Sequence, residues 1–318
     1  MIRIGTRGSA LARWQAAFVA DHLRAHGHTV VLEVVTTAGD RVRHLPFAQV
    51  GNKGIFTKEI DEALESGRID LAVHSLKDLP SELPSRFTLA CVPRRADPRD
   101  AFLARQHATF ASLPQGATVG TSSIRRQSLL RAQRPDLHLI ELRGNVDTRL
   151  RKLEQASCDA IVLAAAGLDR LGLEENIRER FPVEQMCPAA GQGALGIECR
   201  AGEEKIQRAL ATLEHPDSRF AVTLERAALA ALEGGCHVPI GVHCFRREGE
   251  WTALGVVAAP DGTRVVRYAM ALPGETLSAA DAVSAGRMLA ARLLIAGAGD
   301  ILHAAATSAQ TGPADAGA

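Results

Sequence analysis

Lysine is scarce in this chain, and arginine supplies nearly all of the positive charge. Among the 37 lysines and arginines, the only lysines are Lys53, Lys58, Lys77, Lys152 and Lys205. Alanine is abundant as well, so genomic base composition accounts for part of this bias. Arginine is nevertheless the better side chain for bidentate carboxylate binding. The net charge of +1 gives no general reason to expect a nucleic acid or a membrane as a partner.

Long apolar runs and closely paired cysteines are missing too. The chain enters strand-like sequence at residues 1–5 without an apolar signal segment, and no uninterrupted apolar run approaches transmembrane length. The six cysteines include no C-x-x-C pair and fit neither a zinc ribbon nor a disulfide framework. We therefore expect a cytoplasmic protein with reduced thiols. The 318 residues suffice for about two or three domains.

One cysteine has a distinctive setting. Within residues 232–241, Cys236 lies between Gly234-Gly235 and Pro239, after helical sequence and before strand-like sequence. Glycine allows close approach of the backbone to a ligand, and proline stiffens the other side. The pattern is compatible with an attachment point or a nucleophile, although in isolation it is more typical of an ordinary turn cysteine.

A basic residue follows the first predicted strand. Residues 2–5 predict a strand and residues 10–25 a helix, with Ser9 as the N-cap. Arg7 and the free amides of that helix start form a candidate anion site. An ordinary turn with a solvated arginine explains these residues equally well.

Polar residues also follow the strand predicted over 69–73. Lys77 and Asp78 lie just beyond it, where α/β sheets bind ligands. Asp78 is therefore a candidate for acid–base chemistry. The alternatives are a helix cap or a local pair with Lys77, and position favours the functional interpretation only slightly.

The same order of strand, polar cluster and helix recurs in the second half. Strands are predicted over 117–120, 137–142 and 159–165, and the basic residues that follow them are Arg125, Arg126, Arg143, Arg149 and Arg170. Arg125 and Arg126 fall in the first turn of a predicted helix, where cations oppose the helix dipole. That local cost indicates ligand binding. A solvated face explains one such cluster easily, but three in the same topological position less well.

Two polar stretches divide the chain. Residues 93–100 predict one crossing between domains and residues 191–196 another. The second matches G-x-G-x-x-G but lacks the flanking strand and helix of a dinucleotide site, and the glycines around Lys53 lack the ending of a P-loop. We predict an α/β domain over 1–94 with 195–214, an α/β domain over 95–194, an α+β domain over 215–306 and a disordered tail over 307–318.

Five motifs together resemble the hydroxymethylbilane synthase (porphobilinogen deaminase) family. They are Gly5-Thr6-Arg7-Gly8-Ser9, Val73-His74-Ser75-Leu76-Lys77-Asp78-Leu79-Pro80, Gly120-Thr121-Ser122-Ser123-Ile124-Arg125-Arg126-Gln127, Leu142-Arg143-Gly144-Asn145-Val146 and Leu232-Glu233-Gly234-Gly235-Cys236. The similarity covers nearly the whole chain in order, and it is far more specific than any single motif.

The resemblance implies a monomeric transferase of tetrapyrrole and heme biosynthesis. It implies three domains, of which the first two are like the halves of a periplasmic binding protein and the third is a smaller α+β domain. The implied reaction is the head-to-tail condensation of four porphobilinogen molecules with loss of ammonia, followed by hydrolytic release of hydroxymethylbilane. The implied cofactor is a dipyrromethane joined to Cys236 through a thioether.

The resemblance also implies roles for individual residues. Asp78 would contact pyrrole nitrogens and place fixed charge where cationic charge develops as ammonia departs. The implied catalytic residues are Asp78, Arg125, Arg126, Arg149 and Arg170. The implied cofactor-binding residues are Cys236, Asp78, Lys77, Thr121, Ser123, Arg125, Arg126 and Arg143. The implied substrate-binding residues are Arg7, Ser9, Ser75, Arg143, Arg149 and Gln192, and Lys53 is implied to anchor a flexible loop.

Some positions depart from the family pattern. Gln49 stands where the family often has lysine, Ala38 where it often has arginine, and Asn52 where it often has glycine. His237 and His243, near Cys236 and Cys244, lack a recognised metal-ligand spacing, so we expect no metal. Two rival interpretations remain, a solute-binding protein that closes on an anion and a metal-binding regulator. The absent signal segment, the third domain and the setting of Cys236 speak against the first.

Overall fold

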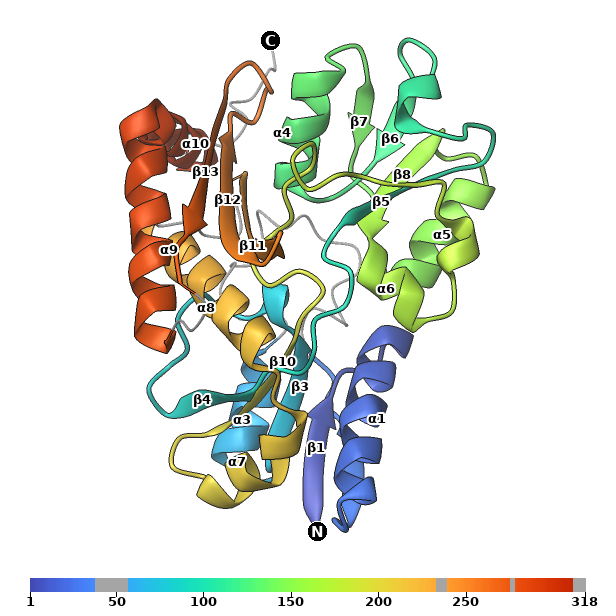
Figure 1. Ribbon diagram of the computed structural model, residues 1–318. Helices are drawn as coiled ribbons and strands as arrows, with labels where there is room; N and C mark the ends of the chain where they lie inside the picture. The colour runs from blue at the N-terminus through green and yellow to red at the C-terminus, as the bar shows by residue number, and fades with distance from the viewer. Residues whose placement is uncertain (38–56, 233–238, 275–277, 311–318) are drawn as a thin grey trace.

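Three β-sheets organise the computed structural model, which describes residues 1–37, 57–232, 239–274 and 278–310 (Figure 1). Two of the sheets are five-stranded and mixed, and the third has three antiparallel strands. Figure 1 shows the first sheet in the lower half of the molecule, the second at the upper right and the third at the upper left. The predicted fold class, two α/β units and a smaller α+β unit, is confirmed.

The first sheet has the order β2-β1-β3-β10-β4. Its strands are β1 (Ile2–Thr6), β2 (Val30–Val34), β3 (Leu71–Ser75), β4 (Phe87–Cys91) and β10 (Leu195–Arg200). β1, β2 and β3 are parallel, and β10 runs antiparallel to both of its neighbours. The sheet is covered on one face by α1 (Ala10–Ala25) and α7 (Glu204–Leu210) and on the other by α3 (Lys58–Glu65). Ser9 caps α1 as predicted, because its hydroxyl accepts a hydrogen bond from the amide of Ala12.

The second sheet repeats this plan with the order β7-β6-β8-β5-β9. Its strands are β5 (Asp100–Ala104), β6 (Thr118–Gly120), β7 (His138–Ile140), β8 (Ala160–Ala164) and β9 (Glu179–Arg180). β6, β7 and β8 are parallel, and β5 runs antiparallel to β8 and β9. The helices of this part are α4 (Ile124–Gln133), α5 (Val146–Glu154) and α6 (Ala165–Arg170), with short 3-10 turns at Phe110–Ser112 and Glu174–Asn176.

In each five-stranded sheet, the chain reverses its direction at one edge. An antiparallel strand begins where its parallel neighbour ends, so Leu195 pairs with Ser75 in the first sheet and Asp100 pairs with Ala164 in the second. The two edges face one another, because α1 contacts α6 and Ala96 donates a backbone hydrogen bond of 3.1 Å to Gly193. The segments that join the two parts therefore run side by side.

The third sheet, in the order β11-β12-β13, packs against helices. It comprises β11 (Ile240–Arg247), β12 (Glu250–Ala258) and β13 (Val265–Leu272), and its helices are α8 (Pro216–Ala231), α9 (Ala279–Leu293) and α10 (Gly299–Gln310), with a 3-10 turn at Ala211–Leu213 before them. The core between α8, α9 and this sheet includes Phe220, Leu224, Val242 and Leu289, and the rings of Phe220 and Trp251 lie 4.6 Å apart.

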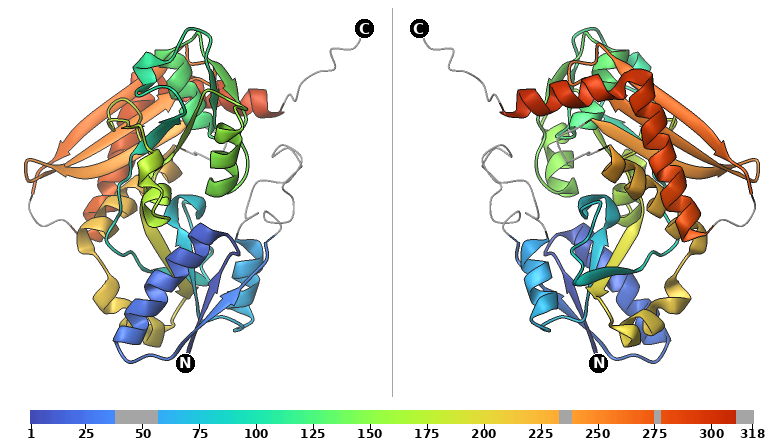
Figure 2. Two further views of the ribbon diagram at one scale, coloured as in Figure 1. Left: turned by 90° about the vertical axis from the view of Figure 1, so that its right-hand side faces the viewer. Right: turned by 90° about the vertical axis from the view of Figure 1, so that its left-hand side faces the viewer.

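One helical stretch, residues 279–305, is long and apolar enough to cross a membrane by length and composition alone. Its sequence contains Arg287 and Arg292, and its Leu289 and Leu293 are buried in the core of the third sheet. A π-helical turn (Leu294–Ala298) with Gly297 at φ 95° separates α9 from α10, and Figure 2 shows the two helices meeting at an angle. The stretch therefore packs one face on the third sheet and bends at Gly297.

Several strands carried no sequence signal. The sequence patterns predicted most of the helices within a few residues, but they did not predict α6, α10, β4, β5, β9 or β10. β5 and most of β10 are buried along their length, so they show no alternation of apolar and polar residues. The predicted tail begins too early, since α10 continues to Gln310. The predicted limits of the domains stay a prediction.

Candidate active site

Asp78 lies on a tight turn at the edge of the first sheet. Directly after β3, residues Leu76–Asp78 form a 3-10 turn. The turn is fixed on β10, because the amide of Leu76 donates a 3.0 Å hydrogen bond to the carbonyl of Ala194. Ser75 at the end of β3 is held by α1, since Gln15 Nε2 donates to Ser75 Oγ over 2.8 Å. Both contacts fix the direction in which the turn presents Asp78.

Arg125 and Arg126 share one buried carboxylate. Both lie in the first turn of α4, as predicted, and Ser123 caps that helix by accepting from the amide of Arg126. Arg125 Nη1 donates to Asp100 Oδ2 over 2.8 Å, and Arg126 Nη2 donates to Asp100 Oδ1 over 2.7 Å. Asp100 is 0% exposed. The unfavourable position of these cations at a helix start is thus offset by a buried anion that the sequence did not reveal.

The electrostatics of this triad follow from burial and pairing. Burial on its own would raise the pKa of Asp100, but the two guanidinium groups overcome it and hold that pKa well below its usual range. Burial lowers the pKa of Arg126, which the charge of Asp100 opposes. Gln192 completes the network, since its Nε2 donates to Asp100 Oδ1 over 2.8 Å and to the carbonyl of Pro98 over 2.7 Å. A carboxylate shared by two arginines leaves this group with a net positive charge.

Lys77 and Arg149 belong to the same electrostatic neighbourhood but lack such an anion. Burial lowers the pKa of Arg149 to about 10, with Arg126 adding repulsion and Asp78 opposing it. Lys77 is exposed to solvent; partial desolvation, and then the charge of Arg126, lower its pKa to about 8. Asp78 and Asp100 oppose that shift. Charged groups from both sheet edges therefore lie within electrostatic range of one another.

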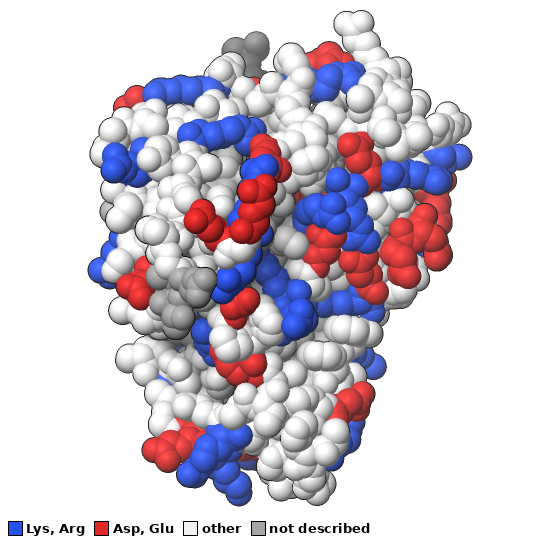
Figure 3. All heavy atoms as spheres, viewed as in Figure 1, with Lys and Arg blue, Asp and Glu red and all other residues white. Residues whose placement is uncertain are grey.

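Within the described part of the chain, Arg149 is incompletely bonded. Its Nη2 donates a 3.3 Å hydrogen bond to Ser122 Oγ, whereas its Nε is buried with no hydrogen-bond partner. On the face drawn in Figure 3, lysine and arginine side chains lie together with acidic ones where the lower and upper halves of the molecule meet. A buried guanidinium nitrogen without a hydrogen-bond partner, close to other cations, is suited to bind an anion.

Other predicted residues have the following contacts. Arg170 donates to the carbonyl of Gly193 over 2.7 Å, and its guanidinium lies 5.9 Å from the centre of the Trp14 ring on α1. Arg143 pairs with Glu141, Nε to Oε1, over 2.7 Å. Thr121 is buried and accepts from the amide of Ser123 over 3.3 Å. Arg7 is half-buried at the start of α1.

Two predicted site residues and four departures from the family pattern fall outside the described residues. Cys236 and Lys53 are among them, and so are the departures at Ala38, Gln49, Asn52 and His237. The chain enters the segment of Cys236 from α8 and leaves it toward β11. On β11, His243 Nδ1 lies 3.2 Å from Glu225 Oε1, and Cys244 is buried. Among the described residues, no group of three or more histidine, cysteine or acidic side chains is arranged to hold a metal ion.

Sequence reasoning missed Asp100 and Glu225. Glu225 is fully buried and receives hydrogen bonds from Arg95 Nη1 at 2.6 Å and from the amides of Gly191 at 2.7 Å and Cys244 at 2.8 Å. It thereby ties both crossing segments to the third sheet. The pairing with Arg95 and His243 overcomes burial and lowers the pKa of Glu225 to about 2. Both acids lie in sequence that reads as a polar linker or an ordinary helix, so no local signal could have found them.

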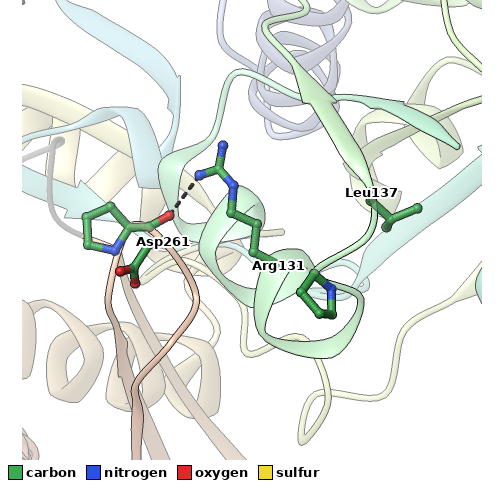
Figure 4. Close-up of a pocket in the computed structure, with 5 residues that line it drawn as sticks. Arg131, Leu137 and Asp261 are labelled. Carbon is green, nitrogen blue, oxygen red and sulfur yellow. Dashed lines mark hydrogen bonds between the residues drawn. The ribbon is translucent and has the colours of Figure 1, made fainter. Parts of the chain in front are cut away.

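A cavity of about 490 Å³ lies elsewhere, between α4 and the turn that joins β12 to β13 (Figure 4). It is lined by Arg131, Pro135, Leu137, Pro260 and Asp261. Figure 4 shows Arg131 reaching across to the carbonyl of Pro260, to which its Nη1 donates over 2.7 Å. This cavity is at the opposite end of α4 from Arg125 and Arg126, and it contains none of the predicted site residues.

Comparison with known proteins gives consistent matches along the chain. The family model described as porphobilinogen deaminase, dipyromethane cofactor binding domain, matches residues 2–208, and that of the porphobilinogen deaminase C-terminal domain matches residues 219–295. The porphobilinogen deaminase of Roseiflexus castenholzii is 52% identical over 298 residues, which cover 93% of this chain and 96% of that protein. The porphobilinogen deaminase of Syntrophotalea carbinolica is 50% identical over 305 residues, 95% of each chain.

Among solved structures, the similarity is lower. A periplasmic substrate-binding protein of an ABC transporter from Coxiella burnetii gives a TM-score of 0.45 at 13% identity, over 68% of this chain and 93% of that one. A nutrient-binding protein from Burkholderia cenocepacia bound to methionine gives 0.43 at 14% identity, over 69% and 94%. At these values the structural likeness carries no argument about function.

Proposed function

The chain belongs to the porphobilinogen deaminase family of tetrapyrrole biosynthesis, and we propose that it condenses four porphobilinogen molecules head to tail with loss of ammonia and then releases hydroxymethylbilane by hydrolysis. The observation that carries the proposal is the position of Asp78, a carboxylate at a sheet edge that faces cations from both lobes. A site that must bind acidic pyrroles and stabilise a cation needs this combination of charges.

The residues present fit the dipyrromethane cofactor of this family. Each pyrrole carries two carboxylates, so a pair of linked pyrroles requires several cationic partners. Among the described residues, Lys77 has no ion pair, and the Nε of Arg149 has no hydrogen-bond partner. Arg125 and Arg126 carry two positive charges against the single negative charge of Asp100. We assign to Lys77, Arg125 and Arg126 the role of holding the cofactor carboxylates, with Thr121, Ser123 and Arg143 beside them. When bound, the cofactor supplies the primer to which the pyrroles are added.

The remaining arginines line the path of the substrate in this proposal. Arg7 at the start of α1, Arg149 and Arg170 hold acetate and propionate groups through bidentate hydrogen bonds, which arginine makes better than lysine. Gln192 and Ser75 add neutral hydrogen-bonding groups near Asp78, and Ser9 fixes the amides at the start of α1. Because the cations come from both sheet edges, a bound acidic chain would draw the two lobes together.

Asp78 supplies the acid–base and electrostatic component. Its carboxylate accepts hydrogen bonds from pyrrole nitrogens and stabilises the cationic species left when ammonia departs, since a fixed negative charge acts most strongly where positive charge develops. Arg149 and Lys77 lie within electrostatic range of it. The turn that carries Asp78 is anchored to Ala194 and, through Ser75, to Gln15, which fixes the carboxylate before the substrate binds.

Cys236 is the attachment point in this proposal. Burial raises the pKa of the other five cysteine thiols, which are Cys91, Cys158, Cys187, Cys199 and Cys244. A buried neutral thiol is a poor nucleophile, so they are unsuited to forming a thioether. Cys236 remains, in a glycine-rich segment that permits close approach of a ligand.

We also propose a monomeric, cytoplasmic enzyme that binds neither nucleic acid nor a membrane. The near-neutral net charge of +1 supports the absence of nucleic acid binding. The bend at Gly297 and the burial of Leu289 and Leu293 support a soluble role for the helical stretch 279–305. Sedimentation of the purified protein and membrane fractionation of cells would test these properties.

Intact mass of the purified protein, followed by peptide mapping, is the decisive experiment. We expect an excess mass equal to two linked pyrroles, localised to the peptide that contains Cys236. The variant Cys236→Ser should show the unmodified mass, and Cys244→Ser, which removes a buried thiol, should keep the excess mass. A wild-type protein that stays unmodified after incubation with porphobilinogen would overturn the proposed function.

A further inference from the structure

A buried pair of titratable side chains lies beneath the turn that carries Asp78. His74 belongs to β3 and is 6% exposed, and Glu198 belongs to β10 and is 1% exposed. His74 Nε2 and Glu198 Oε2 are 3.3 Å apart. Within the described residues, neither atom has a hydrogen-bond partner of good geometry. The site described above uses neither side chain.

The pair lies on the face of the first sheet that α3 covers. β3 and β10 are antiparallel, with His74 opposite Gly196 and Glu198 opposite Ala72, so the two polar side chains point to the same side as Ala72. The remainder of that side is an apolar core that includes Ile60 and Leu64 of α3. A buried ionic or polar pair is no more stable than an apolar pair of similar volume. Stability alone therefore does not explain why these two residues are here.

The location of the pair connects it to the active-site turn. Gly196, opposite His74, is where the turn packs on β10, because a Cβ on Gly196 would lie 2.7 Å from Cδ1 of Leu76. Leu76 also donates its amide to Ala194 on the approach to β10. The relative position of β3 and β10 at His74 consequently determines where the turn, and with it Asp78, is placed.

The charges around the pair come from every element packed against it. On α3, Asp61 has its pKa raised to about 6 by burial and by the charge of Glu198, while His74 and Arg86 lower it. Arg226 of α8 lies within electrostatic range of Glu198. Two acids, one imidazole and two guanidinium groups thus lie close enough to interact electrostatically.

We propose that His74 is a positioning residue for Asp78, in which the Nε2–H of the imidazole donates a hydrogen bond to the carboxylate of Glu198. This bond holds the end of β3 against β10 at the point where the turn begins. The inference rests on the proposed role of Asp78. A small rotation of either side chain completes the bond from the observed 3.3 Å separation.

The kinetic test uses two substitutions at the same position. His74→Leu removes the donor, whereas His74→Gln keeps an amide donor close to the place of Nε2. We expect kcat to fall on the order of 10-fold to 100-fold in His74→Leu, because a misplaced catalytic group costs that much. KM should change by less than about twofold, since the arginines that bind carboxylates are untouched. His74→Gln should recover most of kcat.

The matched control is Ile197→Ala, next to Glu198 on the opposite face of β10. It creates a cavity and lowers the melting temperature, but it leaves the polar pair intact. If His74→Leu loses no more kcat than Ile197→Ala at equal loss of stability, the pair has a structural role only, and the proposal is wrong. A rise in KM with unchanged kcat would contradict it as well.

A second readout does not depend on turnover. Long-range proton–nitrogen NMR spectra of the histidine-labelled holoprotein give the tautomer of His74, whose signals are identified by their absence in His74→Gln. We expect the proton on Nε2 in the wild type and a displaced Nε2 resonance in Glu198→Gln. A proton on Nδ1 would overturn the proposal. Absence of product from the wild-type enzyme would instead refute the proposed function while leaving this spectrum interpretable.

Discussion

Two groups of cations border the same cleft and differ in whether a buried carboxylate pairs with them. Arg125 and Arg126 share Asp100, with N–O distances of 2.8 and 2.7 Å, and all three side chains are buried. Lys77 and Arg149 lie nearby without an ion pair among the described residues. The pKa values of these two are lowered to about 8 and about 10, chiefly by burial.

Because of this difference, we expect the two groups of cations to have different roles, one in positioning and the other in ligand binding. The paired arginines are rigid, because their guanidinium groups are bonded to Asp100 and to the carbonyls of Cys187 and Val162. The unpaired cations carry an unfavourable desolvation that a bound carboxylate would relieve. We infer that the paired group fixes the shape of the cleft, and that the unpaired group contributes most of the gain in free energy when an acidic ligand binds. The predicted ligand contacts of Arg125 and Arg126 stay predictions.

The largest effect is expected at Asp78, the carboxylate that faces the unpaired group. Asp78→Ala should retain the fold and lose nearly all turnover, because the developing positive charge then meets only cations. Steady-state formation of product measures the loss, and circular dichroism checks the fold. Glu82→Ala, an exposed acid shortly after the same turn, is the control and should be fully active. Near-normal turnover of Asp78→Ala would remove Asp78 from the mechanism.

The next effect is on stability and concerns the paired group. Asp100→Asn leaves two buried arginines facing a neutral partner, so the free energy of unfolding should fall by about 3–5 kcal/mol. Urea unfolding at pH 7 measures it. Asp97→Asn is a matched control, since Asp97 pairs with Arg99 and Arg180 near the surface, and such pairs contribute roughly 0–1 kcal/mol.

The pH dependence of the same measurement sharpens the contrast. The pKa of Asp100 is lower in the folded protein than in the unfolded chain. Its stabilising contribution is therefore present above about pH 4 and is lost as the pH falls through the folded-state pKa. Asp100→Asn should lack this acid-dependent component. Equal losses of stability in Asp97→Asn and Asp100→Asn would show that burial does not distinguish the two pairs.

The sequence alone predicted the repeated order of strands and helices and the basic residues that follow the strands. It did not predict which acidic residues pair with those basic residues. Strand ends and helix starts are local patterns, so Ser9, Ser123 and the arginines of α4 were placed correctly. Asp100 becomes the partner of Arg125 and Arg126 only because β5 runs antiparallel to β8 and starts at the edge where β8 ends. That pairing joins residues far apart in sequence, and β5 itself is buried without alternation.

The same reason explains why His74 and Glu198 were not recognised together. They belong to β3 and β10, which are separated by the whole second lobe, and they meet only when the chain returns to the first sheet. His74 was visible as part of a motif around Asp78, but no periodicity marks Glu198 as its neighbour. Local sequence patterns thus predict which residues lie at the edge of a sheet. The sheet topology determines which of these residues have a partner of opposite charge.

The smallest effect is expected from the titration of Lys77. Because its pKa is lowered to about 8, this lysine is fully charged at pH 7 and loses its proton as the pH rises through 8, well before an ordinary lysine would. The affinity for porphobilinogen should therefore weaken by a few-fold between about pH 7 and pH 9, the size of effect expected for one partly solvated ion pair. Lys77→Arg should extend tight binding to higher pH, since arginine stays charged there. Lys205→Arg, on α7 in the first lobe, should leave the pH profile of binding unchanged.

The pH profile of stability has the opposite sign, because deprotonating Lys77 relieves a desolvated charge. The free energy of unfolding therefore rises from about pH 8 upward, until the lysine of the unfolded chain also loses its proton. An affinity that is constant across this range would show that Lys77 is neutralised by a partner and belongs with the paired group.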